Sequence, residues 1–278
     1  MAVTILDGPL GTELLARGVP TPLPGWSAHA LETAPETVAA IHRDYAIAGA
    51  TVLTANTFRT KRRVLPDRWE ALAREAVRIA RAEAPADGRV AGSIAPLEDC
   101  YRPDLSPADG DPDACRAEHA ELAAVLADAG CDLLLCETHP HVGEALLAVE
   151  AAVATGVETW LALSPGYRAD LLSPDELARA AVQAVERGAR AVLVNCVPAA
   201  AALGFVRALV DAAGGAPVGC YANGGSPDAV MGWTSSPPAV EDYAELAAEW
   251  IRAGAEIVGG CCGTGPPHVA RLAARFRD

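Results

Sequence analysis

The stretch IRAGAEIVGGCCGT, residues 251–264, holds the pattern that decides the fold. It closes an alanine-rich amphipathic run, and Gly254 stands where a helix needs a residue that adopts a positive φ. The few apolar residues that follow suffice for a short strand covered on both faces, and small and thiol-bearing residues come after them. The stretch therefore predicts a helix, a turn and a buried parallel strand.

The same pattern recurs as YAIAGATVLTANTF (45–58), LADAGCDLLLCETHP (126–140) and VERGARAVLVNC (185–196). The glycines of these turns are Gly49, Gly130 and Gly188. The predicted strands are VTILDG, ATVLTAN, RVAGSI, CDLLLCE, TWLALSP, AVLVNC, PVGCYAN and EIVGGCC. Eight βα units in a chain of 278 residues favour an α/β fold, a (β/α)8 TIM barrel, with residues 1–278 as a single domain.

Two motifs predict where helices begin. TAPE at 33–36 and SPDE at 173–176 each offer a hydroxyl as N-cap, a proline in the first turn and an acid three residues after the cap. The rival fold is an open, doubly wound sheet. Its dinucleotide-binding fingerprint is absent, because the glycines of DGPLGTEL have the wrong spacing for G-x-G-x-x-G.

Composition narrows the possible partners. The net charge of −14 and the isoelectric point near 4.8 argue against nucleic acid, and no basic run suggests an anionic membrane surface. Strand-like sequence begins at Val3 without a basic and apolar leader, and no apolar run is long enough to span a bilayer. We expect a cytoplasmic protein with small-molecule partners, whose eight cysteines are free thiols. The sequence does not predict the oligomeric state.

Polar and thiol side chains follow the predicted strands, and the carboxyl ends of barrel strands converge on one mouth. The residues collected there are Asp7, Asn56, Glu137, Asn195, Cys196, Asn223, Cys261 and Cys262. Cys196 ends the sixth strand and the Cys261–Cys262 pair ends the eighth, close enough around a barrel for one metal ion to bridge them. Three cysteines predict a Zn²⁺ site with an open fourth position. The alternative is that all three are packing residues.

The remaining cysteines and the histidines have no metal-ligand spacing. We expect Cys100, Cys115, Cys131, Cys136 and Cys220 to be structural. We expect surface or loop positions for His29, His42, His119, His139, His141 and His268. The HPH segment at 139–141 is the one tempting pair.

A zinc ion on three thiolates suits the activation of a substrate thiol, whose free pKa is roughly 8.5. The chemistry implied is alkyl transfer to sulfur. Glu137 and Asp7 are candidates to hold a substrate ammonium group, and the N–H groups of the DGPLGT turn are candidates to hold a carboxylate. The alternative for both acids is solvated or structural pairing.

The chain resembles the homocysteine S-methyltransferase family. The matching segments, in order, are DGPLGTELLARG, WSA, HRDYAIAGATVLTANTF, AGSIAP, LLLCET, VNC, YANGG and GGCCGT. The resemblance implies a barrel enzyme that methylates L-homocysteine to methionine, using S-methylmethionine or S-adenosylmethionine. It assigns the zinc thiolates to Cys196, Cys261 and Cys262, amino-acid binding to Asp7 and Gly8, and ammonium binding to Glu137.

Two loops depart from the family pattern, at 95–111 and 163–174, and both are expected to border the donor side. Trp26 is a candidate for the donor pocket, because an aromatic face stabilises a sulfonium or ammonium methyl group; its alternative role is to cover the mouth. Asn195 is a candidate substrate ligand. The departures leave open a different thiol or selenol acceptor or a betaine-type donor.

Two rival functions remain. A Schiff-base aldolase needs a lysine inside the barrel, whereas Lys61, the one lysine, is expected in a solvated basic loop. A non-catalytic zinc- or thiol-binding barrel is the other alternative.

Overall fold

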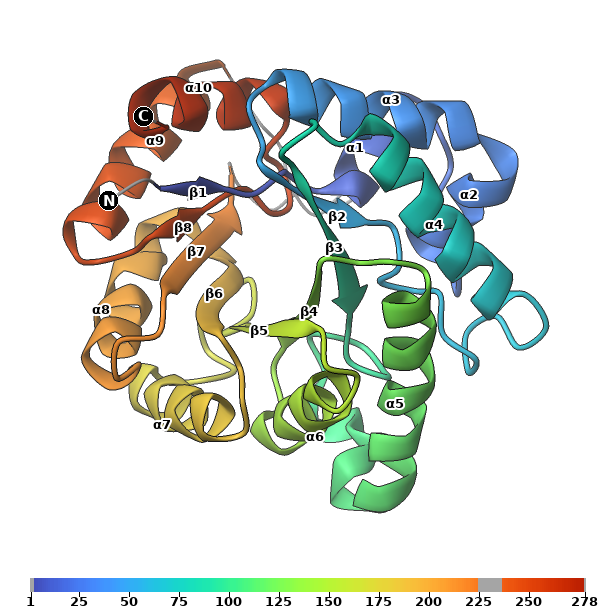
Figure 1. The fold of residues 1–278 in the computed structure, drawn as a ribbon. Coiled ribbons are helices and arrows are strands. Elements are labelled where there is room, and N and C mark those ends of the chain that lie inside the picture. Colours follow the sequence, from blue (N-terminus) through green and yellow to red (C-terminus); the bar gives the residue numbers. More distant parts are fainter. Residues whose placement is uncertain (1–2, 225–236, 278) are drawn as a thin grey trace.

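Parallel strands lie side by side at the centre of the molecule, and helices surround them (Figure 1). The computed structural model describes residues 3–224 and 237–277, and it describes the backbone alone at residues 237 and 238. Within these residues eight strands form one sheet in the order β1-β8-β7-β6-β5-β4-β3-β2. A parallel bridge between Leu6 and Val52 joins the two ends of the sheet and closes the barrel. The predicted α/β fold, a (β/α)8 TIM barrel, is confirmed.

All eight strand sequences form strands. The strands are β1 (Thr4–Ile5), β2 (Val52–Ala55), β3 (Arg89–Ile94), β4 (Leu133–His139), β5 (Glu158–Leu163), β6 (Ala191–Pro198), β7 (Val218–Asn223) and β8 (Ile257–Val258). The helices are α1 (Leu10–Ala16), α2 (Ala30–Thr33), α3 (Pro35–Ile47), α4 (Trp69–Glu83), α5 (Pro112–Asp128), α6 (Val142–Val153), α7 (Pro174–Glu186), α8 (Ala202–Ala212), α9 (Pro237–Arg252) and α10 (Pro266–Phe276). Short 3-10 turns lie at Trp26–His29, Pro103–Leu105, Pro107–Asp109 and Ala199–Ala201.

Each apolar strand serves two cores because successive side chains point to opposite faces. In β4, Leu133 and Leu135 pack inside the barrel, while Leu134 and Cys136 belong to the layer between sheet and helices. Both sets are buried, which is why the strands read as continuous apolar runs instead of alternating ones. Gly254 has a φ of +113° between α9 and β8, as its place in the sequence predicts.

One predicted helix start is right and one is wrong. Ser173 caps α7 with a reciprocal pair of bonds to Glu176. Thr33 is not an N-cap: it ends α2, and its hydroxyl donates to the carbonyl of His29 at 2.9 Å. Ala34 occupies the N-cap position of α3, because a short helix precedes the TAPE motif and uses the threonine.

The histidine prediction is wrong at four positions. His42, His119, His139 and His268 are buried, while His29 and His141 are partly exposed. His42 lies on the inner face of α3 and His139 lies at the end of β4, where their rings fill core space. An alanine-rich helix gives few bulky apolar side chains, and these rings supply volume instead. In the described residues, no helix is both long enough and apolar enough to cross a membrane.

Candidate active site

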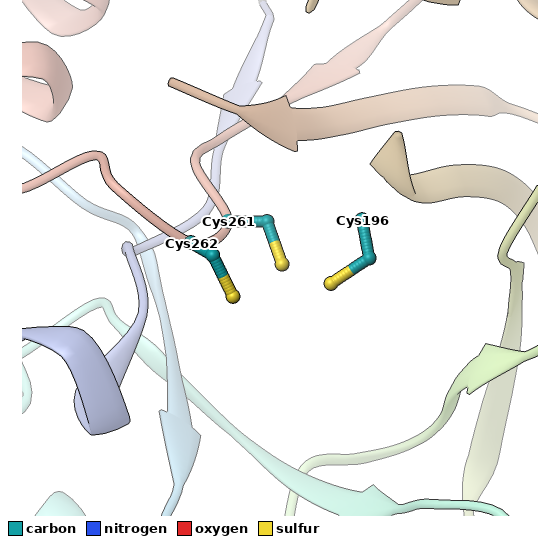
Figure 2. A group of neighbouring side chains, drawn as sticks. All are labelled: Cys196, Cys261 and Cys262. Carbon is teal, nitrogen blue, oxygen red and sulfur yellow. The ribbon is translucent and has the colours of Figure 1, made fainter. Parts of the chain in front are cut away.

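Three cysteines meet at the carboxyl ends of β6 and β8. Cys196 lies in β6, and Cys261 and Cys262 follow β8. Their sulfur atoms all lie within 4.8 Å of one another. Figure 2 shows the three side chains turned toward one shared space. The sequence prediction that these distant cysteines come together is thus what the structure shows.

The backbone is unusual where it presents the thiols. Cys196 has a φ of +50°, and the pairing of β6 with β7 shifts between Asn195 and Pro198. A left-handed residue in a strand costs about 1–2 kcal/mol, and a bulge of this kind redirects the side chain. Before the thiol pair, a Cβ on Gly260 would lie 2.1 Å from Thr264 Oγ1, so only glycine fits there.

Hydrogen bonds among the three thiols shift their pKa values in opposite directions. Hydrogen bonds from Cys196 and Cys261 lower the pKa of Cys262 well below its usual value. The hydrogen bonds with its two partners, together with burial, raise the pKa of Cys196 well above its usual value. Buried negative charge between sulfur atoms favours a soft cation, because a positive ion lets the other thiols ionise as well.

Three converging thiols, that of Cys196 buried and those of Cys261 and Cys262 partly buried, fit zinc, which takes sulfur ligands and leaves one position open in catalytic sites. A second group, Cys115, His119 and Glu144, also has its ligand atoms within 4.8 Å of one another. Both carboxylate oxygens of Glu144 already accept hydrogen bonds, from the Leu97 N–H and the Ser106 hydroxyl, each at 2.6 Å. The second group is therefore engaged in holding a loop.

Asp7 and Glu137 are two of the carboxylates that line the same cavity as the thiols. Asp7 follows β1 and accepts hydrogen bonds from the Thr54 N–H at 2.7 Å and the Thr54 hydroxyl at 2.9 Å. Burial raises the pKa of Asp7 to about 7, although the bonds from Thr54 oppose this. Glu137, in β4, accepts from Ser93 and from Tyr221 at 2.9 Å. Two fixed acids near the thiols suit a substrate that carries an ammonium group.

Gly8 and Trp26 also line the cavity. A Cβ on Gly8 would lie 2.6 Å from the Tyr45 hydroxyl, which donates to the Pro9 carbonyl. Trp26 meets Phe58 edge to face with ring centroids 5.9 Å apart. The indole and the phenyl ring together form an aromatic wall.

Asn195 has a different position. It is buried and absent from the described residues that line the cavity, and its Nδ2 donates to Thr138 Oγ1 at 2.8 Å. Asn56 lines the cavity, accepts from Ser27 and donates to its carbonyl. Asn223 is buried, while Gly225 of the YANGG motif lies outside the described residues.

Sequence reasoning gave no site role to several lining residues. These are Ser93, Tyr221, Phe58, Arg59, Cys100 and Tyr101. Ser93 and Tyr221 stand in the AGSIAP and YANGG motifs, and a polar side chain within each predicted strand was a usable signal. Tyr101 lies in the divergent loop 95–111, and its ring meets Tyr167 of the second divergent loop with centroids 5.1 Å apart. The two loops therefore meet.

The prediction for Lys61 is wrong. Its side chain is 4% exposed, and the ammonium group donates to the carbonyl of Pro96. Burial lowers its pKa to about 7. The loop after β2 packs against the loop after β3, and the Lys61 ammonium group donates to a backbone carbonyl of that second loop. Lys61 is not among the described residues that line the cavity.

The closed barrel and its thiol-rich mouth define the class of (β/α)8 barrels with a set of thiols at the strand ends that could hold a metal ion. The family model for homocysteine S-methyltransferase matches residues 4–276. The chain therefore belongs to the homocysteine S-methyltransferase family, and it is a methyltransferase.

Individual relatives agree over almost the whole length. The Escherichia coli (strain K12) homocysteine S-methyltransferase is 32% identical over 300 residues, covering 98% of this chain and 95% of that protein. A selenocysteine methyltransferase of Astragalus bisulcatus is 28% identical, covering 95% and 90%. The metallated crystal structure of the E. coli homocysteine methyltransferase MmuM has a TM-score of 0.81 and 27% identity, covering 99% of this chain and 96% of that chain.

Proposed function

We propose that this protein moves a methyl group from a sulfonium donor, S-methylmethionine or S-adenosylmethionine, to the thiolate of L-homocysteine, giving methionine. The observation that carries the proposal is the convergence of three sulfur atoms within 4.8 Å in a cavity that also holds Asp7 and Glu137. We further propose that Cys196, Cys261 and Cys262 hold Zn²⁺. The ion, when bound, would supply the positive charge that keeps a substrate thiol ionised at neutral pH.

The chain's own residues position the acceptor. Glu137 and Asp7 bind its ammonium group, and hydrogen bonds from Ser93, Tyr221 and Thr54 fix both carboxylates before substrate arrives. The turn at Gly8 faces the same cavity and offers backbone N–H groups to the substrate carboxylate. These contacts point the acceptor sulfur toward the thiol cluster.

The aromatic wall holds the donor. Trp26 and Phe58 present ring surfaces that attract the positively charged methylsulfonium group. The acceptor sulfur forms the new S–CH3 bond as the methyl group leaves the donor sulfur, which keeps the electron pair of the broken bond. The donor departs as a neutral thioether and needs no proton, so alignment of the two sulfur atoms is the main task of the site.

The experiment is a scan of donors. Zinc-loaded protein is incubated with L-homocysteine and S-methylmethionine, S-adenosylmethionine or betaine, and methionine is measured by mass spectrometry. Methionine from a sulfonium donor supports the proposal. Methionine from betaine alone would show that the donor is of the betaine type and not a sulfonium compound. If no donor gives product although homocysteine binds, the barrel is a thiol-binding protein or acts on another acceptor. L-Selenocysteine is the acceptor to try next.

The aldolase alternative has a separate test. Borohydride reduction in the presence of a carbonyl substrate traps a Schiff base if a lysine amine forms one. Because the Lys61 amine is buried against the Pro96 carbonyl, we expect no adduct. The cytoplasmic location stays a prediction.

A further inference from the structure

Arg59 gives the cavity a positive charge. It follows β2 by four residues and is the one cationic side chain among the described residues that line the cavity. The other charged lining residues are acids, Asp7, Asp99 and Glu137, and the three thiols add negative charge. Among the described lining residues, Arg59 is therefore the one charged side chain that suits a ligand anion.

Arg59 has no protein partner among the described residues. Its Nε is buried without a hydrogen bond, and no ion pair reaches its guanidinium group. The neighbouring arginines differ: Arg62 pairs with Glu121, and Arg63 pairs with Glu118. A buried N–H without an acceptor is unfavourable, and a ligand oxygen that accepts from it removes this cost.

Asp99, an acid that also lines the cavity, does not pair with Arg59. Asp99 accepts from the N–H of Tyr101 at 2.8 Å, and no ion pair within 4.0 Å joins it to Arg59. A carboxylate from a ligand matches the planar guanidinium group with two parallel hydrogen bonds. Among the residues that the structure describes, the guanidinium group of Arg59 therefore has no acidic partner within the cavity.

The surroundings of Arg59 indicate which substrate carries this carboxylate. Its guanidinium carbon lies 5.7 Å from the centre of the Phe58 ring, which in turn meets Trp26. Arg59 therefore belongs to the aromatic wall, whereas Asp7 and Glu137 belong to the thiol side. A donor whose methylsulfonium group lies on these rings brings its carboxylate toward Arg59.

We propose that Arg59 determines donor specificity by binding the carboxylate of the methyl donor. The substrate class is a carboxylated sulfonium compound, and the amino-acid sulfonium S-methyl-L-methionine is its probe. This inference rests on the proposed function, because it assumes that the aromatic wall receives the donor. Arg59 is a binding residue and takes no part in the transfer of the methyl group.

The test compares two ligands that differ in the carboxylate. Binding of S-methyl-L-methionine and of (3-aminopropyl)dimethylsulfonium is measured by calorimetry without homocysteine, so that no reaction occurs. The proteins are the zinc-loaded wild type, Arg59→Met, Arg59→Lys and the control Arg62→Met, whose arginine pairs with Glu121 on the outside. In parallel, homocysteine is added to the same proteins, and kcat and the KM for S-methyl-L-methionine are measured.

We expect Arg59→Met to weaken binding of S-methyl-L-methionine by about 10- to 100-fold, the value of a charged bidentate pair. (3-Aminopropyl)dimethylsulfonium should bind equally to all four proteins. Arg59→Lys should recover part of the lost affinity for S-methyl-L-methionine. In the kinetic assay of Arg59→Met, the KM for S-methyl-L-methionine should change more than kcat. Equal affinity of wild type and Arg59→Met for S-methyl-L-methionine, or an equal loss for both ligands, would overturn the inference.

The two proposals fail separately. If wild type makes methionine while Arg59→Met keeps the wild-type KM, the function stands and the inference is wrong. If wild type makes no methionine from any donor, the function is wrong, and the calorimetric comparison of the two ligands still decides the role of Arg59.

Discussion

The side chain of Asn195 donates from Nδ2 to Oγ1 of Thr138 at 2.8 Å, joining the bulged ends of β6 and β4. Thr138 has a φ of +62° and follows Glu137, just as Cys196, with a φ of +50°, follows Asn195. One buried bond therefore ties the strand end that presents a thiol to the strand end that presents an acid.

Thr138→Val removes this hydroxyl and keeps the branched shape. We expect it to destabilise the protein by about 1–3 kcal/mol, because Asn195 loses the partner of a buried N–H, and to lower zinc affinity through the misplaced Cys196. Urea unfolding and a zinc titration measure the two effects. Thr138→Ser keeps the hydroxyl and is the control; if Ser and Val variants lose zinc equally, the bond has no positioning role.

Glu144 holds both ends of the loop that carries Cys100 and Tyr101 to the cavity. Burial alone would raise its pKa, but hydrogen bonds from His119, Leu97 and Ser106 lower it well below its usual value. Glu144→Gln replaces an acceptor by a donor, so we expect a loss of about 1–3 kcal/mol at pH 7.

Hydrogen exchange of residues 97–106 localises the effect of Glu144→Gln, and Glu118→Gln, on the outer ion pair with Arg63, is the control. The contribution of Glu144 is present above pH 4.5, the usual pKa of a glutamate, and is lost as the pH falls through its lowered folded-state pKa. Unchanged exchange in the loop of Glu144→Gln would contradict the role given to this residue.

His42 makes the stability of the fold depend on pH. The ring is fully buried in α3, neither nitrogen has a hydrogen-bond partner within residues 3–224 and 237–277, and burial lowers its pKa from 6.5 to about 4. Between these values the unfolded chain binds a proton that the folded chain does not. The free energy of unfolding therefore falls as the pH drops from 6.5 to 4, by about 3 kcal/mol for this residue.

Urea unfolding of wild type and His42→Leu across pH 4–7 tests this dependence. We expect the variant to lose less stability with acid than wild type, by about one proton's contribution. His29→Leu, a change at a partly exposed histidine, is the matched control. Parallel curves for wild type and His42→Leu would show that the buried ring does not titrate as inferred.

The fold could be predicted because its signals are local. A glycine at 254 and a short apolar run after it specify a turn and a buried strand without reference to the rest of the chain. The thiol cluster followed from topology, since strand ends in a barrel meet at one mouth. The prediction of Ser173 as an N-cap was correct. The prediction of Thr33 as an N-cap was wrong, because Thr33 ends α2, and a helix of four residues leaves no strong periodic pattern in the sequence.

The positions of Lys61 and Arg59 could not be predicted, because they depend on how loops pack against one another. Lys61 is charged and stands among arginines, so its sequence gives no sign that the loop after β3 covers it. Arg59 looks like its neighbours in sequence. Only the three-dimensional arrangement separates it, an arginine that lines the cavity, from Arg62, which pairs with Glu121 outside. Contacts of this kind are decided by tertiary packing and have no local pattern.

The most direct measurement follows methionine formation as zinc is returned to chelator-treated protein, in wild type and in Cys261→Ala. The account predicts that the rate in wild type rises with zinc to a plateau at one ion per chain, and that Cys261→Ala neither retains zinc nor makes methionine. Cys131→Ala, a change at a buried thiol outside the cavity, should follow wild type. Full activity of the zinc-free protein or of Cys261→Ala would contradict the central claim that the three thiols hold the ion used in methyl transfer.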